Sequence, residues 1–168
     1  MNEKKVIRFS SDSPAGVSLL EWWTELEQNR GDRAALRRCA SLTEVVFLPI
    51  YHRLRMELLC LGRVDDEGLA LVVALAARVK SHAGGESVAA QMAAPKVPGG
   101  PSKVSDLRFR RLLRMKTRAD LFPALSRMVA LLGGTVNLLS LANSAYWWNE
   151  RTRKEWAFDY YSSALEKK

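Results

Sequence analysis

Apolar residues recur with helical spacing along nearly the whole chain, and this feature restricts the possible folds most. No alternating run of β-branched residues is long enough to indicate a convincing strand. Prolines and glycines interrupt the helical pattern and divide it into short segments. The sequence therefore predicts an all-α protein whose helices pack their apolar faces against one another.

Capping signals place the first helices of this pattern. Ser18 is predicted to cap a helix that runs to about residue 28, and Asp32 is predicted to cap the next one. Ser41 and Glu44 have the spacing of a capping box, which predicts a third helix from Ser41 onward.

A proline divides that third helix. Pro49 has no N–H to donate, so we expect a kink or a restart there, followed by a helical piece that ends at Gly62. Asp65 and Asp66 open a further helix that is apolar on nearly every side. We expect this helix to be central to the first bundle.

Glycines and prolines are concentrated in residues 84–101, a segment too interrupted to hold one regular element. An alanine-rich piece around 88–94 could form a short helix within it. We therefore predict two small helical bundles in tandem, joined by a Gly/Pro-rich linker. The predicted domains are residues 1–83, the linker 84–101, and residues 102–168 with a basic face.

Four helices are predicted after the linker. Their approximate ranges are 106–118, 118–132 with a start signal at Thr117 and Asp120, 135–148, and 150–165 capped by Asn149. Gly133 and Gly134 end the second of these helices.

The first of these helices, with the sequence D-L-R-F-R-R-L-L-R-M-K-T-R, has two different faces. Phe109, Leu112 and Leu113 fall on one side. The other side carries four arginines, which are Arg108, Arg110, Arg111 and Arg114. Like charges this close repel one another, so the pattern favours a ridge that binds a polyanion. A helix face that is simply solvated is the alternative.

Basic residues exceed acidic ones over the whole sequence, 26 to 18, which gives a net charge of +8. Such an excess favours an anionic partner, either nucleic acid or an acidic membrane surface. Outside the ridge, the candidate contacts are Arg37 and Arg38 on the second helix, Arg53 after the proline restart, and Arg151. Arg151 lies in the first turn of the last helix, where the helix dipole disfavours a cation.

Catalytic equipment is sparse in this sequence. His52 and His82 lie on different predicted helices, and Cys39 and Cys60 have no pairing or zinc-binding spacing. No phosphate-binding glycine loop or dinucleotide fingerprint occurs. We therefore expect no enzyme activity, no metal and no cofactor, with both cysteines reduced and buried.

We expect no signal peptide, because the N-terminal residues lack the apolar run of one. We also expect no membrane span, because no apolar stretch is both long enough and free enough of interruptions. We expect a cytoplasmic protein.

Several pieces of the chain, in this order, resemble one known family. They are A-L-R-R (35–38), L-P-I-Y-H-R-L (48–54), R-F-R-R-L-L-R (108–114), R-A-D-L (118–121) and W-W-N-E-R-T-R-K-E-W-A-F-D-Y-Y (147–161). Together these pieces resemble the CasB family, the small subunit of the type I-E CRISPR Cascade surveillance complex. The segment 136–138 lacks the Asp-Trp pair of that family, and residues 84–101 match nothing in it.

The resemblance implies a non-catalytic helical protein that works inside a larger complex. The implied partners are crRNA and target DNA, the backbone subunit CasC, the large subunit CasA and a second copy of the chain, with no membrane contact. The basic surface would hold the target DNA and the displaced strand of the R-loop through sequence-independent phosphate contacts.

Carried over by position, the strand contacts that the resemblance implies are Arg38, Arg53, Arg108, Arg114 and Arg118. We expect guanidinium groups from both bundles to lie on one continuous outer surface. Two alternatives stay open, a helical adaptor that binds an acidic protein without nucleic acid and a membrane-surface protein.

Overall fold

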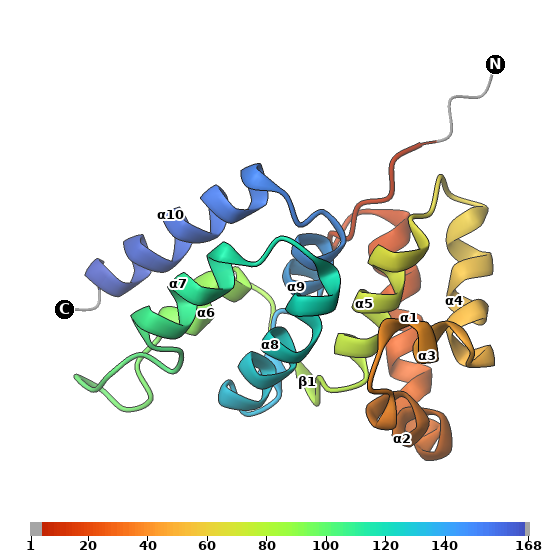
Figure 1. Ribbon diagram of the computed structural model, residues 1–168, viewed down its shortest axis with the longest axis horizontal. Coiled ribbons are helices and arrows are strands. Elements are labelled where there is room, and N and C mark those ends of the chain that lie inside the picture. The colour runs from red at the N-terminus through yellow and green to blue at the C-terminus, as the bar shows by residue number, and fades with distance from the viewer. Residues whose placement is uncertain (1–4, 167–168) are drawn as a thin grey trace.

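The computed structural model describes residues 5–166, and the regular secondary structure within them is almost entirely helical (Figure 1). The first half contains α1 (Pro14–Gln28), α2 (Arg30–Arg38), α3 (Leu42–Val46), α4 (Pro49–Leu59) and α5 (Asp66–Ala76). The second half contains α6 (Val88–Ala93), α7 (Asp106–Arg114), α8 (Arg118–Leu131), α9 (Leu138–Tyr146) and α10 (Glu150–Glu166). The predicted helical fold class is confirmed.

Several helix starts follow the predicted capping residues. The Ser41 side chain accepts a hydrogen bond from the Glu44 N–H at the start of α3, and Pro49 occupies the first turn of α4. Thr117 accepts from the Asp120 N–H to cap α8. Ser41 and Thr117 each satisfy a backbone donor of the first turn, whereas Pro49 removes a donor that would have no partner there.

The first two helices begin earlier than predicted. Ser13, not Ser18, caps α1, because its hydroxyl accepts from the Gly16 N–H and Pro14 then fits the first turn. Helix α2 begins at Arg30, so Asp32 lies inside its first turn rather than at the cap. There its carboxylate still faces the positive end of the helix dipole.

Helix α5 lies in the middle of the molecule and is buried over nearly its whole length. It packs against α3 of the first half and against α8 and α9 of the second half. One cluster of buried apolar side chains therefore runs through both halves. The division into two domains stays a prediction, but the halves share this core.

The Gly/Pro-rich segment 84–101 is packed against the second half. Ser87 caps α6, whose residues Val88 and Met92 are fully buried, and α6 packs along α10. The following loop turns back on itself through an antiparallel bridge between Pro95 and Ser102. This segment thus contributes to the core, which differs from a plain linker.

Two short strands, which the sequence pattern did not indicate, join the halves. Strand β1 (Ser81–His82) pairs in parallel with β2 (Thr135–Val136). Gly133 and Gly134 both have positive φ angles and turn the chain from α8 into β2. Helix α9 consequently starts at Leu138 rather than at residue 135.

The N-terminal segment also contacts both halves. The Trp147 indole donates a hydrogen bond to the Ile7 carbonyl, and the Phe9 N–H donates to the Asn143 side chain. Val6 forms a parallel bridge with Arg63, which follows α4. This segment therefore holds the end of α4 beside α9 and its C-terminal turn.

Candidate nucleic-acid interface

Helix α7 carries the arginine ridge, and its apolar side fixes its orientation. Phe109 and Leu112 are buried, and the Phe109 ring stacks on Tyr160 of α10 with 3.9 Å between ring centroids. Ser105 caps the helix by accepting from the Arg108 N–H. Since α7 ends at Arg114, the predicted range 106–118 was one turn too long.

Three arginines of α7 are exposed and have no hydrogen-bond or ion-pair partner for their side chains among residues 5–166. They are Arg108, Arg111 and Arg114, which we call the α7 ridge. The last turn of α7 contains Arg111 and Arg114, where the helix dipole favours a cation. The dipole does not account for Arg108, which lies in the first turn. An unneutralised cluster of this kind is suited to an external anion.

Arg110 differs from its neighbours because it has an acidic partner. Its Nε lies 3.1 Å from Oδ2 of Asp106, and the other oxygen of Asp106 accepts a hydrogen bond of 2.5 Å from the Tyr161 hydroxyl. Burial, together with this hydrogen bond, raises the pKa of Tyr161 to about 12. Asp106 thus partly neutralises Arg110 and ties α7 to α10.

A small cavity lies between α7 and α8, and we call it the cup. Three arginines form its rim, Arg108 and Arg111 from α7 and Arg127 from α8. The floor is apolar and consists of Val104, Leu112, Met115, Ala124, Met128 and Leu131. Its volume is about 160 Å³. Sequence reasoning missed Arg127, because only the packing of α7 on α8 brings it beside the ridge.

Arg118 lies apart from the ridge and is already engaged. Its Nη2 is 2.6 Å from Oδ2 of Asp65 and 2.9 Å from the Tyr146 carbonyl, and its Nη1 is 4.0 Å from Glu67. Its side chain is only 24% exposed. These partners give Arg118 a structural role, and its expected contact with a strand stays a prediction.

Arg37 and Arg38 are exposed at the end of α2. The Nε of Arg37 donates to the Ala77 carbonyl at 2.8 Å, and Arg33 donates to the same carbonyl. Burial, and after it the charge of Arg33, lowers the pKa of Arg37. Arg38 has no side-chain partner among the described residues and is free to meet a ligand.

Two further cations lie close to Arg37. Arg78 donates to the Arg37 carbonyl at 3.2 Å and lies over the Phe122 ring at 4.9 Å. Arg37, Arg78 and Lys80 line one open cavity of about 360 Å³ beside the C-terminal end of α8. We call these three the α2–α5 cluster. Of these three, sequence reasoning found Arg37 and missed Arg78 and Lys80, because both follow an apolar helix and nothing local links them to α2.

Arg53 and Arg151 are exposed, and each has an acidic neighbour. Arg53 is 3.9 Å from Glu25, and Arg151 is 3.2 Å from Glu155 one turn away. Figure 1 places α4, which carries Arg53, at the opposite end of the long axis from α7. The helices that carry the candidate arginines are thus spread along the molecule, and the expected continuous surface stays a prediction.

The histidines and cysteines have local structural surroundings. His82 accepts a hydrogen bond from the Leu138 N–H, and a ring nitrogen of His52 lies 2.7 Å from the Val46 carbonyl. Cys39 is buried as expected, which raises the pKa of its thiol. Cys60 is exposed, contrary to expectation, because it follows the last turn of α4 on its outer side. No group of three or more His, Cys, Asp or Glu that could hold a metal ion occurs within residues 5–166.

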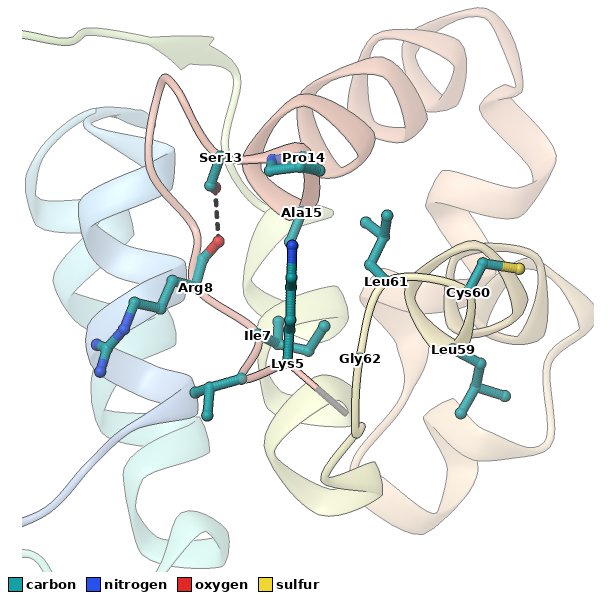
Figure 2. A pocket seen from close by; sticks show the side chains of 11 residues that line it. Lys5, Ile7, Arg8, Ser13, Pro14, Ala15, Leu59, Cys60, Leu61 and Gly62 are labelled. Atoms are coloured by element: carbon teal, nitrogen blue, oxygen red, sulfur yellow. Dashed lines mark hydrogen bonds between the residues drawn. The ribbon is translucent and has the colours of Figure 1, made fainter. Parts of the chain in front are cut away.

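An open pocket of about 670 Å³ lies between the N-terminal segment, the start of α1 and the end of α4 (Figure 2). The Ser13 hydroxyl donates to the Arg8 carbonyl at its edge, at 2.6 Å. The Arg8 side chain points away from the pocket, toward the Trp147 ring. The basic groups at this pocket are thus few, and we do not assign it to the interface.

None of the helices in the described part of the chain has the length and apolar character needed to cross a membrane.

Fold and site together define a basic, helical protein, and its distinguishing groups are exposed arginines that have no partner within the described part of the chain. The family model for CRISPR-associated protein Cse2 matches residues 32–161, so the chain belongs to the Cse2 family. It is accordingly a non-catalytic CRISPR-associated protein, as the sequence predicted.

Two solved structures have a similar fold. A chain in the crystal structure of E. coli Cascade bound to a PAM-containing double-stranded DNA target is 19% identical, with a TM-score of 0.68 over 89% of this chain and 96% of that one. CasB from Thermus thermophilus is 24% identical, with a TM-score of 0.66 over 89% of this chain and 99% of that one. No curated protein matches the sequence significantly.

Proposed function

We propose that this protein is a subunit of a CRISPR Cascade complex and holds nucleic acid there by its phosphate backbone. The observation that carries the proposal is the α7 ridge, where Arg108, Arg111 and Arg114 are exposed and have no partner among the described residues. The similar E. coli chain comes from a Cascade bound to DNA, which supports the assignment.

The chemistry of the ridge suits phosphates. A guanidinium group is planar, stays charged, and donates two parallel hydrogen bonds to phosphate oxygens. Contacts of this kind position a strand but read no sequence. In an RNA-guided complex, base pairing reads the sequence, so a subunit that adds only charge and shape is sufficient. The proposed ligands are crRNA, target DNA and the displaced strand of the R-loop.

The other candidate arginines are expected to contribute less to strand binding than the α7 ridge does. Arg38 has no side-chain partner within residues 5–166 and forms the second proposed contact, together with Arg37 of the α2–α5 cluster. A strand could recruit Arg53, Arg110 and Arg151 only in competition with their carboxylate partners. Exposed ion pairs are weak, so this competition is feasible, but it reduces what each contact contributes. Other Cascade subunits, including CasC, CasA and a second copy of this chain, are proposed as protein partners.

Binding of labelled single-stranded DNA at several salt concentrations tests this function. We expect log Kd to change linearly with log salt, with a slope of about 0.7 per neutralised phosphate. Reversing the ridge with R108E, R111E and R114E should remove most of the affinity and reduce the slope by about three phosphate contacts.

A matched control changes the same amount of charge elsewhere. Lys5, Arg30 and Arg63 are exposed and lie outside the proposed contacts, so their triple change to Glu keeps the total charge equal to that of the ridge variant. If the control variant lost as much affinity as the ridge variant, general charge rather than the ridge would explain binding. Unchanged affinity in the ridge variant would reject the proposed contact.

A further inference from the structure

We propose that the cup between α7 and α8 receives one unpaired nucleobase of a single strand whose phosphates lie on its arginine rim. The inference rests on the proposed function and adds a base-binding site to it. The ligand class is thereby narrowed from any polyanion to single-stranded nucleic acid.

The rim and floor of the cup differ in chemistry, and this difference defines the ligand. Arg108, Arg111 and Arg127 are all exposed, and none has a side-chain partner among residues 5–166. Leu112 and Met128 also line the cavity, and both are buried and have apolar side chains. A ligand that satisfies both parts carries an apolar flat or compact group directly beside a negative charge.

The size of the cavity restricts the occupant further. A volume of about 160 Å³ is several times the roughly 30 Å³ that one water molecule occupies in the liquid. It is smaller than the roughly 300–1,000 Å³ of sites that enclose a drug-sized molecule. The occupant is therefore one small group that projects from a larger ligand lying outside.

A nucleotide in a single strand meets these conditions. Each base projects from a backbone that carries a phosphate next to it, and every base has an apolar π-face that packs on a hydrophobic or guanidinium surface. In a duplex the bases are paired and stacked, so they cannot enter the cup without flipping. The cup thus favours single strands, whereas the ridge alone would accept single and double strands alike.

Comparing a normal strand with an abasic strand of equal length and charge separates base binding from phosphate binding. We expect the full-length protein to bind a single-stranded oligothymidylate at least about fivefold more tightly than the abasic strand at the same salt concentration. The variant A124L fills the cup and keeps all three arginines. It should bind the normal strand more weakly than the unaltered protein does, with an affinity close to that for the abasic strand.

Ala157 offers a matched control, because it is also half-buried and does not line the cup. A157L should keep the preference for the normal strand. Since A124L could also disturb folding, cross-linking of the unaltered protein to a strand that carries 5-iododeoxyuridine provides an independent measurement. The expected cross-links fall on residues 104–131, which include the floor of the cup.

The two proposals fail in different ways. If neither strand binds the unaltered protein at low salt, the proposed nucleic-acid function is wrong. If both strands bind with equal affinity, or the cross-links fall outside 104–131, the base site is wrong while the phosphate ridge stands. If an acidic peptide with an apolar side chain competes and single strands do not bind, the ligand is a protein.

Discussion

The Nη2 atom of Arg118 lies 2.6 Å from Oδ2 of Asp65, and this ion pair joins the two halves of the chain. Asp65 precedes α5, and Arg118 opens α8. The same Nη2 also donates to the carbonyl of Tyr146, the last residue of α9. The Tyr146 hydroxyl in turn accepts from the Asp65 N–H at 2.7 Å. One guanidinium therefore fixes the ends of three central helices.

Replacing Arg118 with Gln is expected to lower the free energy of unfolding by about 1–3 kcal/mol, because Asp65 and the Tyr146 carbonyl lose a charged donor in a half-buried site. Urea unfolding measures the change. R114Q is the matched control, since Arg114 is exposed and unpaired among the described residues, and its change should stay within about 0.5 kcal/mol. Equal stability of the two variants would contradict the structural role of Arg118.

The position of Arg118 shows what a helical pattern cannot reveal. Its place at the start of R-A-D-L is evident from Thr117 and Asp120, and the cap was predicted correctly. Its partners Asp65 and Tyr146 are 53 and 28 residues away in the sequence, and nothing local indicates them. The sequence thus predicts where this helix begins, while tertiary packing decides what its first side chain does.

Phe109 is expected to be essential for holding the ridge. Its ring is fully buried and stacks on Tyr160, so F109A should cost about 3–5 kcal/mol of stability. F158A on α10 is the control, since Phe158 is 70% exposed and its truncation should cost about 0.5 kcal/mol or less. Thermal and urea unfolding measure both effects. Similar losses of stability in the two variants would show that the Phe109 ring is not what holds α7 against α10.

The ion pair of Arg55 with Asp66 should make stability depend on pH in the acid range. The hydrogen bond from Arg55, at 2.6 Å, lowers the pKa of Asp66 below its ordinary value. A carboxyl whose pKa is depressed by folding stabilises the protein above its unfolded pKa of about 3.9. This stabilisation is lost as the pH falls through the lower, folded value.

We therefore expect the difference in stability between the unaltered protein and D66N to be largest near neutral pH and to shrink below about pH 4. Urea unfolding at a series of pH values provides the measurement. E67Q is a suitable control, because the ion pair of Glu67 among the described residues is a distant one, 4.0 Å from Arg118. A pH-independent difference for D66N would show that the carboxylate charge does not matter there.

The α2–α5 cluster also contains both residues that the sequence predicts and residues that only the structure reveals. Arg37 and Arg38 were recognisable as candidates because they lie in a basic turn. Arg78 and Lys80 were not, since they follow the apolar helix α5 and reach Arg37 only through the packing of α2 on α5. Local charge patterns thus located the centres of both basic regions, and tertiary contacts added Arg78, Lys80 and Arg127.

Arg37 and Arg38 are adjacent in sequence but are expected to respond differently to mutation. R38Q should weaken single-strand binding and reduce the salt slope by about one phosphate contact without changing stability, because its side chain has no partner among residues 5–166. R37Q should also lower stability, because Arg37 donates to the Ala77 carbonyl at the negative end of α5. Binding at several salt concentrations and urea unfolding test both variants. If R38Q left binding unchanged while R37Q lowered stability, the arginines at the end of α2 would stabilise the fold and would not bind the strand. The proposed strand contact would then rest on the α7 ridge.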